Sequence, residues 1–97
     1  MMTLDTLRGE KRAEILRVAE AHGARNVRVF GSLARGEATT RSDVDFLVDL
    51  APDRTLMDLG GLLVELQATL HQPVDVATEG MLRPKVREQA LRDAVLL

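Results

Sequence analysis

Apolar residues recur along this chain with two periods, one typical of helices and one typical of strands. Where they return every three or four residues, they predict a helix with one side facing a core. Where they alternate with polar residues, they predict a half-buried strand. Glycine, proline and short polar segments separate these stretches. We therefore expect helices over residues 5–22, 55–71 and 85–93, strands over 26–30, 42–50 and 74–76, and one helical turn over 32–36.

The two longer helices have recognisable apolar stripes. The stripe of the first helix consists of Ile15, Leu16, Val18 and Ala19. The stripe of the second has spacings of three and four and consists of Leu56, Leu59, Leu63, Leu66 and Leu70. Gly60 and Gly61 interrupt this second stripe, and we expect close packing against the sheet to be the reason.

The order of the elements predicts an α/β fold in which helices pack on one face of a small mixed sheet. The second face of the sheet is then left for a substrate. Ninety-seven residues correspond to one domain, so we expect residues 1–97 to form a single unit. The apolar segment 94–97 would either close the core or meet a partner.

Composition narrows the classes of function. The net charge is −2 and aromatic residues make up 2%, so direct nucleic-acid binding is not expected. Residues 8–41 hold eight Lys or Arg, whereas residues 42–82 hold eight Asp or Glu. This distribution suits a metal–triphosphate site, although solvated helix faces would give the same bias. The absence of cysteine, of a signal peptide pattern and of an apolar run of about 18 residues predicts a cytoplasmic protein without a membrane span.

The candidate chemistry lies between residues 31 and 50. Asp43 and Asp45 are separated by one residue in a predicted strand, so their side chains share a face. Two adjacent carboxylates repel each other, and a divalent cation with oxygen ligands would explain the pair. The alternative is a solvated strand face, which the low strand propensity of aspartate disfavours.

Gly31 and Ser32 follow the first predicted strand directly. Glycine allows a phosphate to approach the backbone closely, and N–H groups at a helix start bind anions. The alternative for these two residues is an ordinary strand-to-helix turn with a serine cap. The two aspartates that follow favour the phosphate-binding interpretation.

Residues Gly31 to Leu50 resemble the nucleotidyltransferase superfamily that includes DNA polymerase beta. More narrowly, they resemble its small stand-alone members, the minimal nucleotidyltransferases (MNT proteins). The motif consists of Gly31-Ser32, ten intervening residues and Asp43-Val44-Asp45, with Ala34-Arg35-Gly36 and Ser42 also as in that family. The resemblance implies the catalytic palm of the superfamily and transfer of a nucleoside monophosphate from a nucleoside triphosphate.

The resemblance also implies roles for individual residues. Gly31 and Ser32 would hold the β- and γ-phosphates, and Asp43 and Asp45 would bind two magnesium ions. The superfamily has a third carboxylate on a later strand, and Asp75 is the candidate because it shares their face if Val74 and Val76 face the core. The alternative interpretation of Asp75 is an ordinary aspartate at the edge of a strand.

Two arginines are further candidates for phosphate contacts. Arg35 precedes the polar loop over residues 37–41, and Arg41 is its last residue. Each could bind the phosphates of a nucleotide, and each is equally well explained as a surface arginine.

The resemblance implies a partner as well. Small MNT proteins often act as antitoxins beside a HEPN-domain ribonuclease toxin, and transfer AMP from ATP to a tyrosine of that toxin. Two alternatives stay open for this sequence. It could be a non-catalytic MNT-like subunit that neutralises a partner by occlusion, or it could transfer the nucleotide to a small molecule.

Overall fold

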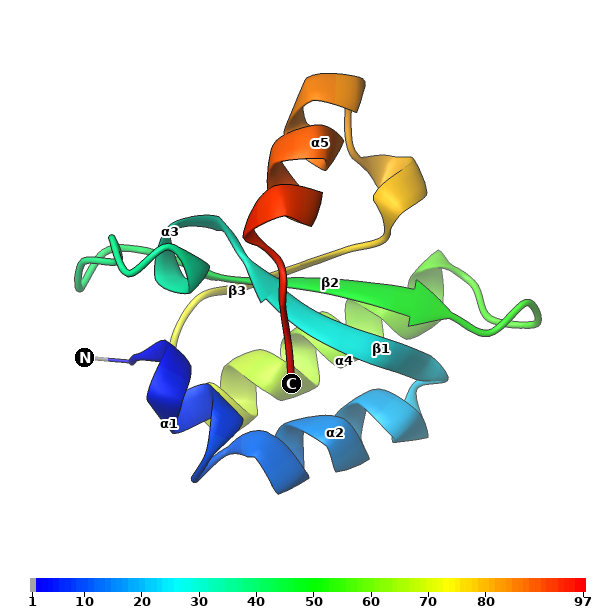
Figure 1. Ribbon diagram of the computed structural model, residues 1–97. Helices are drawn as coiled ribbons and strands as arrows, with labels where there is room; N and C mark the ends of the chain where they lie inside the picture. Colours follow the sequence, from blue (N-terminus) through cyan, green and yellow to red (C-terminus); the bar gives the residue numbers. More distant parts are fainter. Residues whose placement is uncertain (1) are drawn as a thin grey trace.

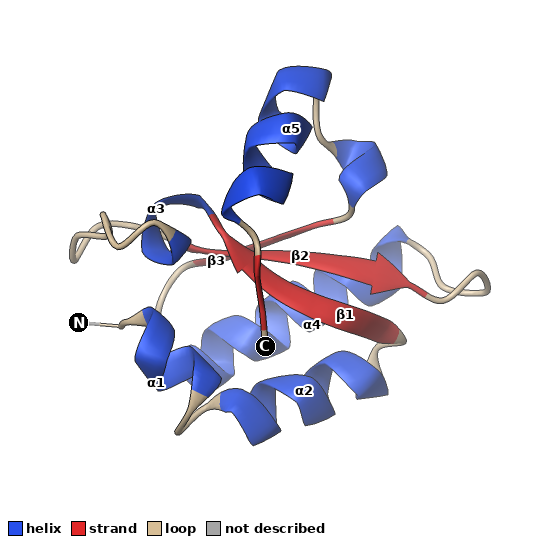
Figure 2. Cartoon of the chain, viewed as in Figure 1, coloured by secondary structure: helices blue, strands red, loops and turns tan. Residues whose placement is uncertain are grey.

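The computed structural model describes residues 2–97 and confirms an α/β fold with a small mixed sheet (Figures 1 and 2). The strand order is β3-β2-β1-β4, with β2 parallel to β3 and with β1 antiparallel to both its neighbours. The elements in chain order are α1 (Leu4–Arg8), α2 (Arg12–Ala21), β1 (Ala24–Phe30), α3 (Gly31–Ala34), β2 (Val44–Leu50), α4 (Leu56–Leu70), β3 (Val74–Ala77), the 3₁₀ turn η1 (Glu79–Met81), α5 (Pro84–Asp93) and β4 (Val95–Leu96).

The main core lies between the sheet and the helices α1, α2 and α4, which cover one face together (Figure 1). Alternate strand residues point into this core, as the period of two requires. The strand residues of the core are Ala24, Val27, Val29, Val44, Phe46, Val48, Val74 and Val76. No helix among residues 2–97 is both long and apolar enough to cross a membrane.

The opposite face of the sheet is partly covered by η1 and α5, which lie across the sheet from α2 and α4 (Figure 1). Leu47 points to this face and is completely buried, and Ala77 and Ala90 are buried outside the main core. Asp43 and Asp75 are exposed. The C-terminal helix therefore covers one part of the second face, which the sequence predicted to be free of helices, and leaves the carboxylates accessible.

The prediction of one helix over residues 5–22 is wrong, because the chain breaks at Gly9 into α1 and α2. Gly9 has φ −108° and ψ −93°, which is not a helical conformation. Its N–H donates to the Asp5 carbonyl, and a Cβ at this position would lie 3.1 Å from that oxygen. The bend lets Leu7 and Ile15 both enter the core.

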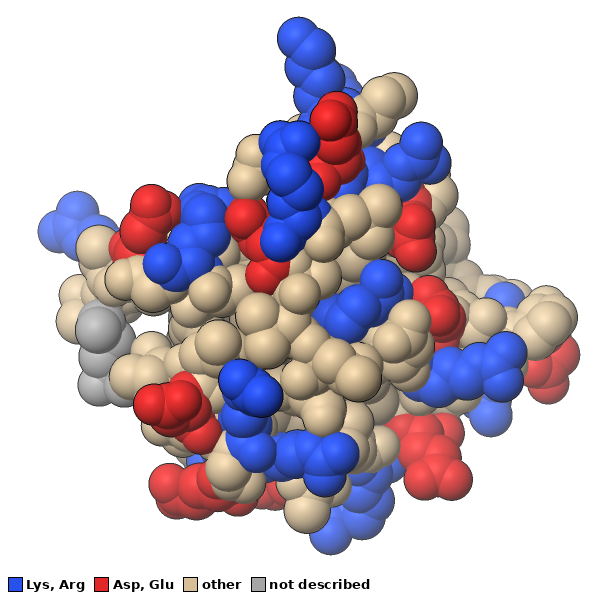
Figure 3. All heavy atoms as spheres, in the orientation of Figure 1, with Lys and Arg blue, Asp and Glu red and all other residues tan. Residues whose placement is uncertain are grey.

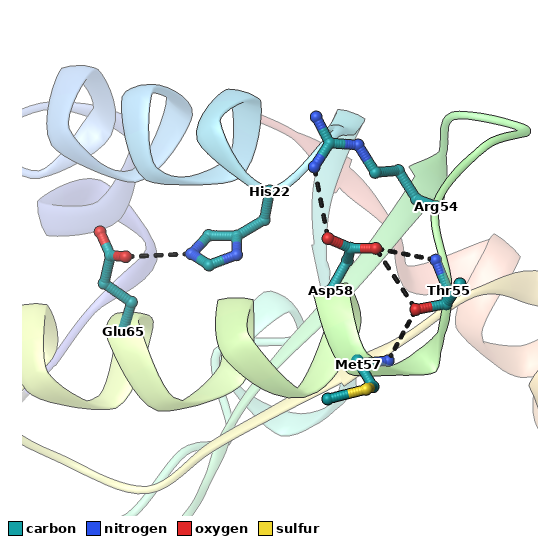
Figure 4. Close-up of polar contacts among 6 residues, drawn as sticks. All are labelled: His22, Arg54, Thr55, Met57, Asp58 and Glu65. Atoms are coloured by element: carbon teal, nitrogen blue, oxygen red, sulfur yellow. Dashed lines mark hydrogen bonds and ion pairs between the residues drawn. The ribbon is translucent and has the colours of Figure 1, made fainter.

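The apolar stripe of α4 is rotated from the predicted one. Leu59, Leu66 and Leu70 are buried as expected, but Leu62 completes the set and Leu56 is exposed. Leu63 is only partly buried against the core, and the fit of α4 to the neighbouring surface selects this rotation. Thr55 caps the start of the helix. Its hydroxyl accepts the Met57 N–H, and Asp58 accepts the Thr55 N–H in a capping box (Figure 4).

The glycine pair in α4 does not pack against the sheet as predicted. Gly61 faces α2, where a Cβ would lie 3.0 Å from His22 Cε1. The His22 ring in turn contacts Glu65 Oε1 at 3.0 Å (Figure 4). Gly60 has no atom within 4 Å of an added Cβ, apart from its chain neighbours and its own helix backbone. Gly61 therefore serves helix–helix packing, whereas Gly60 has no such role within residues 2–97.

The strands also differ from their predicted limits. β1 begins at Ala24 rather than residue 26, and β2 begins at Val44 rather than residue 42. The C-terminal segment forms β4 on the edge of β1, and its Leu97 N–H donates to the Val27 carbonyl. Leu97 is buried, so this segment closes the core.

Candidate active site

The site is centred on the junction between β1 and α3. Gly31 follows β1 without an intervening loop and has φ +74°, a conformation that side chains other than glycine rarely adopt. A Cβ at Gly31 would collide with Asp45 Oδ2. The backbone at this turn and the Asp45 carboxylate therefore occupy neighbouring space. Ser32 follows as the second residue of α3, and Leu33 anchors this short helix in the core.

Strand register brings Asp45 and Asp75 together. In the parallel pair of β2 and β3, Asp45 is the direct partner of Asp75. On its other side Asp45 is the partner of Phe30, the residue before Gly31. Val74 and Val76 lie in the core, so Asp75 points to the opposite face, as predicted from the alternation.

Asp43 lies one residue before β2 rather than inside it. It remains close enough for its charge to act on Asp45. The loop before it is ordered by Ser42, whose hydroxyl oxygen accepts the Thr39 N–H at 2.9 Å. The structure therefore brings Asp45 and Asp75 together by strand register and leaves Asp43 in the loop, close enough for its charge to act on Asp45.

The electrostatics of the site are dominated by negative charge. The pKa of Asp45 is raised to about 6, first by burial and then by the charges of Asp75 and Asp43, against a smaller opposite effect of Arg35. Within residues 2–97, none of the three carboxylates forms an ion pair with a lysine or arginine. Such a site favours binding of a cation.

Magnesium fits the chemistry of these side chains, which are hard oxygen donors. In the described part of the chain, no three Asp, Glu, His or Cys side chains converge closely enough to hold an ion by themselves. Magnesium usually takes its other ligands from water and from substrate phosphates. The arrangement therefore suits an ion that arrives with a triphosphate rather than a closed protein cage.

The two candidate arginines have different surroundings. Arg35 donates to Glu37 at 2.9 Å and to Asp93 at 2.7 Å, and so joins the end of α3 to α5. Asp93 was not predicted from sequence, since it lies 58 residues from its partner and belongs to no motif. For Arg41, which is exposed, the side chain makes no hydrogen bond or ion pair within residues 2–97.

Asp49 continues the face of Asp43 and Asp45 but belongs to a different cluster. It accepts hydrogen bonds from Arg28 at 3.1 Å and from Asn26 at 3.0 Å. Arg28 also pairs with Glu79 of η1 at 3.6 Å. These contacts connect the far end of the face to the segment that leads into α5, and they separate Asp49 from the candidate site.

The chain belongs to the nucleotidyltransferase domain family, whose sequence model matches residues 13–97. It is 35% identical over 95 residues to the protein adenylyltransferase MntA of Thermococcus cleftensis. That match covers 98% of this chain and 96% of the relative. The family assignment agrees with the glycine turn, the aspartate pair and the palm-like sheet found in the structure.

Solved structures show the same fold. One, described as a candidate minimal nucleotidyltransferase, has 47% sequence identity and a TM-score of 0.85 over 99% of this chain and 97% of the other. A second, a toxin–antitoxin crystal structure with AMP-PNP, has 19% identity and a TM-score of 0.73 over 87% of this chain and 69% of the other. This second similarity shows a shared fold and nothing more.

Proposed function

We propose that this chain transfers AMP from ATP to a tyrosine hydroxyl of a HEPN-type toxin and thereby acts as its antitoxin. The observation that carries the proposal is the fit of the Gly31 backbone against Asp45, with Asp75 in register on the next strand. Support comes from the relative in Thermococcus cleftensis, whose name is protein adenylyltransferase MntA. The toxin–antitoxin structure of the same fold contains AMP-PNP, an ATP analogue.

Each residue of the site has a role in this proposal. Gly31 and Ser32 bind the β- and γ-phosphates of ATP, with Arg35 and Arg41 as further phosphate contacts. The carboxylates that would hold two magnesium ions are Asp43, Asp45 and Asp75. Bound magnesium would neutralise phosphate charge and stabilise the attacking and leaving oxygens.

The reaction is an in-line displacement at the α-phosphorus of ATP. The acceptor oxygen forms a bond to this phosphorus, and the bond to the pyrophosphate oxygen breaks. Asp75 receives the proton of the acceptor hydroxyl, and pyrophosphate leaves with the electron pair. The products are a phosphodiester between AMP and the acceptor, and pyrophosphate.

The accessibility of the carboxylates supports an acceptor on a separate protein. Asp43 and Asp75 are both exposed, although α5 packs over β1 on the same face and reaches the end of α3. A tyrosine on a protein surface can therefore approach Asp75 without an opening movement of the chain.

The test is a transfer assay with a HEPN-domain protein as the acceptor. The two purified proteins are incubated with magnesium and with ATP labelled at either the α- or the γ-phosphate. We expect label from the α-position on the HEPN protein and none from the γ-position. Mass spectrometry should place one AMP on a tyrosine.

The control is the Asp45→Asn variant, which should leave the HEPN protein unlabelled. A stable complex of the two wild-type proteins without label would contradict the proposal and favour neutralisation by occlusion. Label on an added small molecule, with none on the protein, would indicate the third possibility.

A further inference from the structure

The outer side of α4 exposes apolar residues that no other part of residues 2–97 covers. The side chains of Leu56, Met57 and Val64 are 72%, 86% and 64% exposed. Gly60 and Ala68 on the same side of the helix are exposed as well. We call these five residues the α4 stripe. Contiguous exposed apolar surface of this kind marks a site of association.

The α4 stripe carries no charge. The two acidic residues of α4 lie on its α2 side, where Asp58 pairs with Arg54 and Glu65 contacts His22. Figure 4 shows these side chains directed toward α2, whereas Met57 points away from them. Two identical copies of the stripe could therefore face each other without repulsion between like charges.

Gly60 adds a second observation. A glycine inside a helix lowers helix stability relative to alanine. Gly61 is explained by its contact with His22, but a Cβ at Gly60 would meet nothing outside its own helix within 4 Å. A partner that approaches α4 from outside residues 2–97 would give the missing side chain at Gly60 a use.

The order of large and small residues within the α4 stripe indicates which partner binds it. Leu56, Gly60, Val64 and Ala68 follow each other at intervals of four, and large residues alternate with small ones. An antiparallel copy of α4 centred on residue 62 would place Val64 over Gly60 and Leu56 over Ala68. Each large side chain of one copy would then lie over a small residue of the other copy. A two-fold interface requires this kind of self-complementarity. We propose that the α4 stripe binds the α4 stripe of a second copy of this chain.

The size of the interface sets the expected strength. Stable interfaces bury about 800 Å² on each partner, which corresponds to roughly 20–30 residues. The helix α4 has 15 residues and contributes only one side, so the interface is small and the dimer should have micromolar affinity. The carboxylates lie on the opposite face of the sheet, so both sites in the dimer stay open and the inference does not depend on the proposed function.

The first test is sedimentation velocity over a range of concentrations. The wild-type mass should rise from the monomer value of 10.7 kDa toward twice that value. Val64→Glu places like charges in the interface, and Gly60→Arg blocks close approach, so both variants should stay monomeric. Val86→Glu changes an exposed valine of α5 in the same way and should dimerise like the wild type.

The second test uses the absence of cysteine from the chain. The Gly60→Cys variant should give a covalent dimer with a short thiol-reactive cross-linker, whereas the Val86→Cys variant should not. Circular dichroism shows whether each variant is folded. The proposal is overturned if the wild type stays monomeric, if Val64→Glu and Gly60→Arg still dimerise, or if cross-linking occurs at residue 86 rather than residue 60. A wild-type monomer that binds only a different protein through α4 overturns it too.

Discussion

Gly31 lies against Asp45 so closely that a side chain at Gly31 would collide with Asp45 Oδ2. The positive φ of Gly31 turns the chain directly from β1 into α3 at this point. The same short distance allows one ligand to contact both the backbone of the turn and the carboxylate. This relationship makes Gly31 and Asp45 the part of the site most sensitive to small substitutions.

The first prediction compares two glycines with the same backbone conformation. Gly31 and Gly36 both have φ +74°, but a Cβ at Gly36 would meet nothing within 4 Å. Gly36→Ala should cost about 1–2 kcal/mol of backbone strain and leave nucleotide binding unchanged. Gly31→Ala should cost more, because it also displaces Asp45, and should lower the affinity for magnesium–ATP at least tenfold. Urea unfolding and calorimetric titration measure the two effects, and equal results for both variants would contradict the prediction.

The second prediction concerns Asp45 and the pH dependence of stability. Burial first, and then the charges of Asp75 and Asp43, raise its folded-state pKa from 3.8 to about 6. Between these values the folded state binds more protons than the unfolded state, so stability falls as the pH rises from about 4 to 6. Asp45→Asn removes this loss of stability, because asparagine does not ionise. The variant should match the wild type below pH 4 and be more stable by about 1–2 kcal/mol at pH 8, after allowance for solvent screening.

Asp58 provides a control of opposite sign for this experiment. A hydrogen bond from the Thr55 backbone lowers the pKa of Asp58, and the interaction with Arg54 lowers it further. Its stabilising effect is present above the unfolded pKa and is lost as the pH falls. Asp58→Asn should therefore be less stable than the wild type at pH 7, and the difference should disappear in acid. Thermal melts of both variants across pH 3–8 measure these effects. The account is contradicted if both substitutions change the stability at neutral pH in the same direction.

The third prediction separates the roles of Asp45 and Asp75. Asp45 contacts the turn that would hold the phosphates, so Asp45→Asn should weaken magnesium–ATP binding and abolish transfer. Asp75 lies on the next strand and would act on the acceptor hydroxyl. Asp75→Asn should keep magnesium–ATP affinity within a few-fold of the wild type and lower the transfer rate by about 10²–10⁴-fold. The measurements are calorimetry and single-turnover transfer, and near-normal transfer by Asp75→Asn would remove this residue from the site.

The fourth prediction tests the orientation of α4. Leu62 is completely buried in the core, whereas Leu56 is exposed near the start of the helix. Leu62→Ala should destabilise the fold by about 2–5 kcal/mol, because it leaves a cavity. Leu56→Ala should change the free energy of unfolding by less than about 0.5 kcal/mol in the monomer. Denaturant titrations at low protein concentration give both values, and a large loss at Leu56 would indicate that α4 is rotated.

The sequence by itself determined the features that depend on local spacing. The alternation in residues 42–50 and 74–76 assigned Asp43, Asp45 and Asp75 to one face, since the side-chain period of a strand is fixed by backbone geometry. The Gly-Ser and Asp-Val-Asp motif indicated the family that the comparisons established. The caps also identified the start of α4, because Thr55 and Asp58 act over three residues.

Only the tertiary structure decided which distant residues meet. The register of β2 and β3 made Asp75 the partner of Asp45, and no local rule sets the alignment of two strands 30 residues apart. The Arg35–Asp93 pair depends on where α5 crosses the second face. The break at Gly9 and the choice of Leu62 over Leu56 followed from packing, because several rotations of an apolar helix satisfy the same periodicity and the fit to the neighbouring surface selects one.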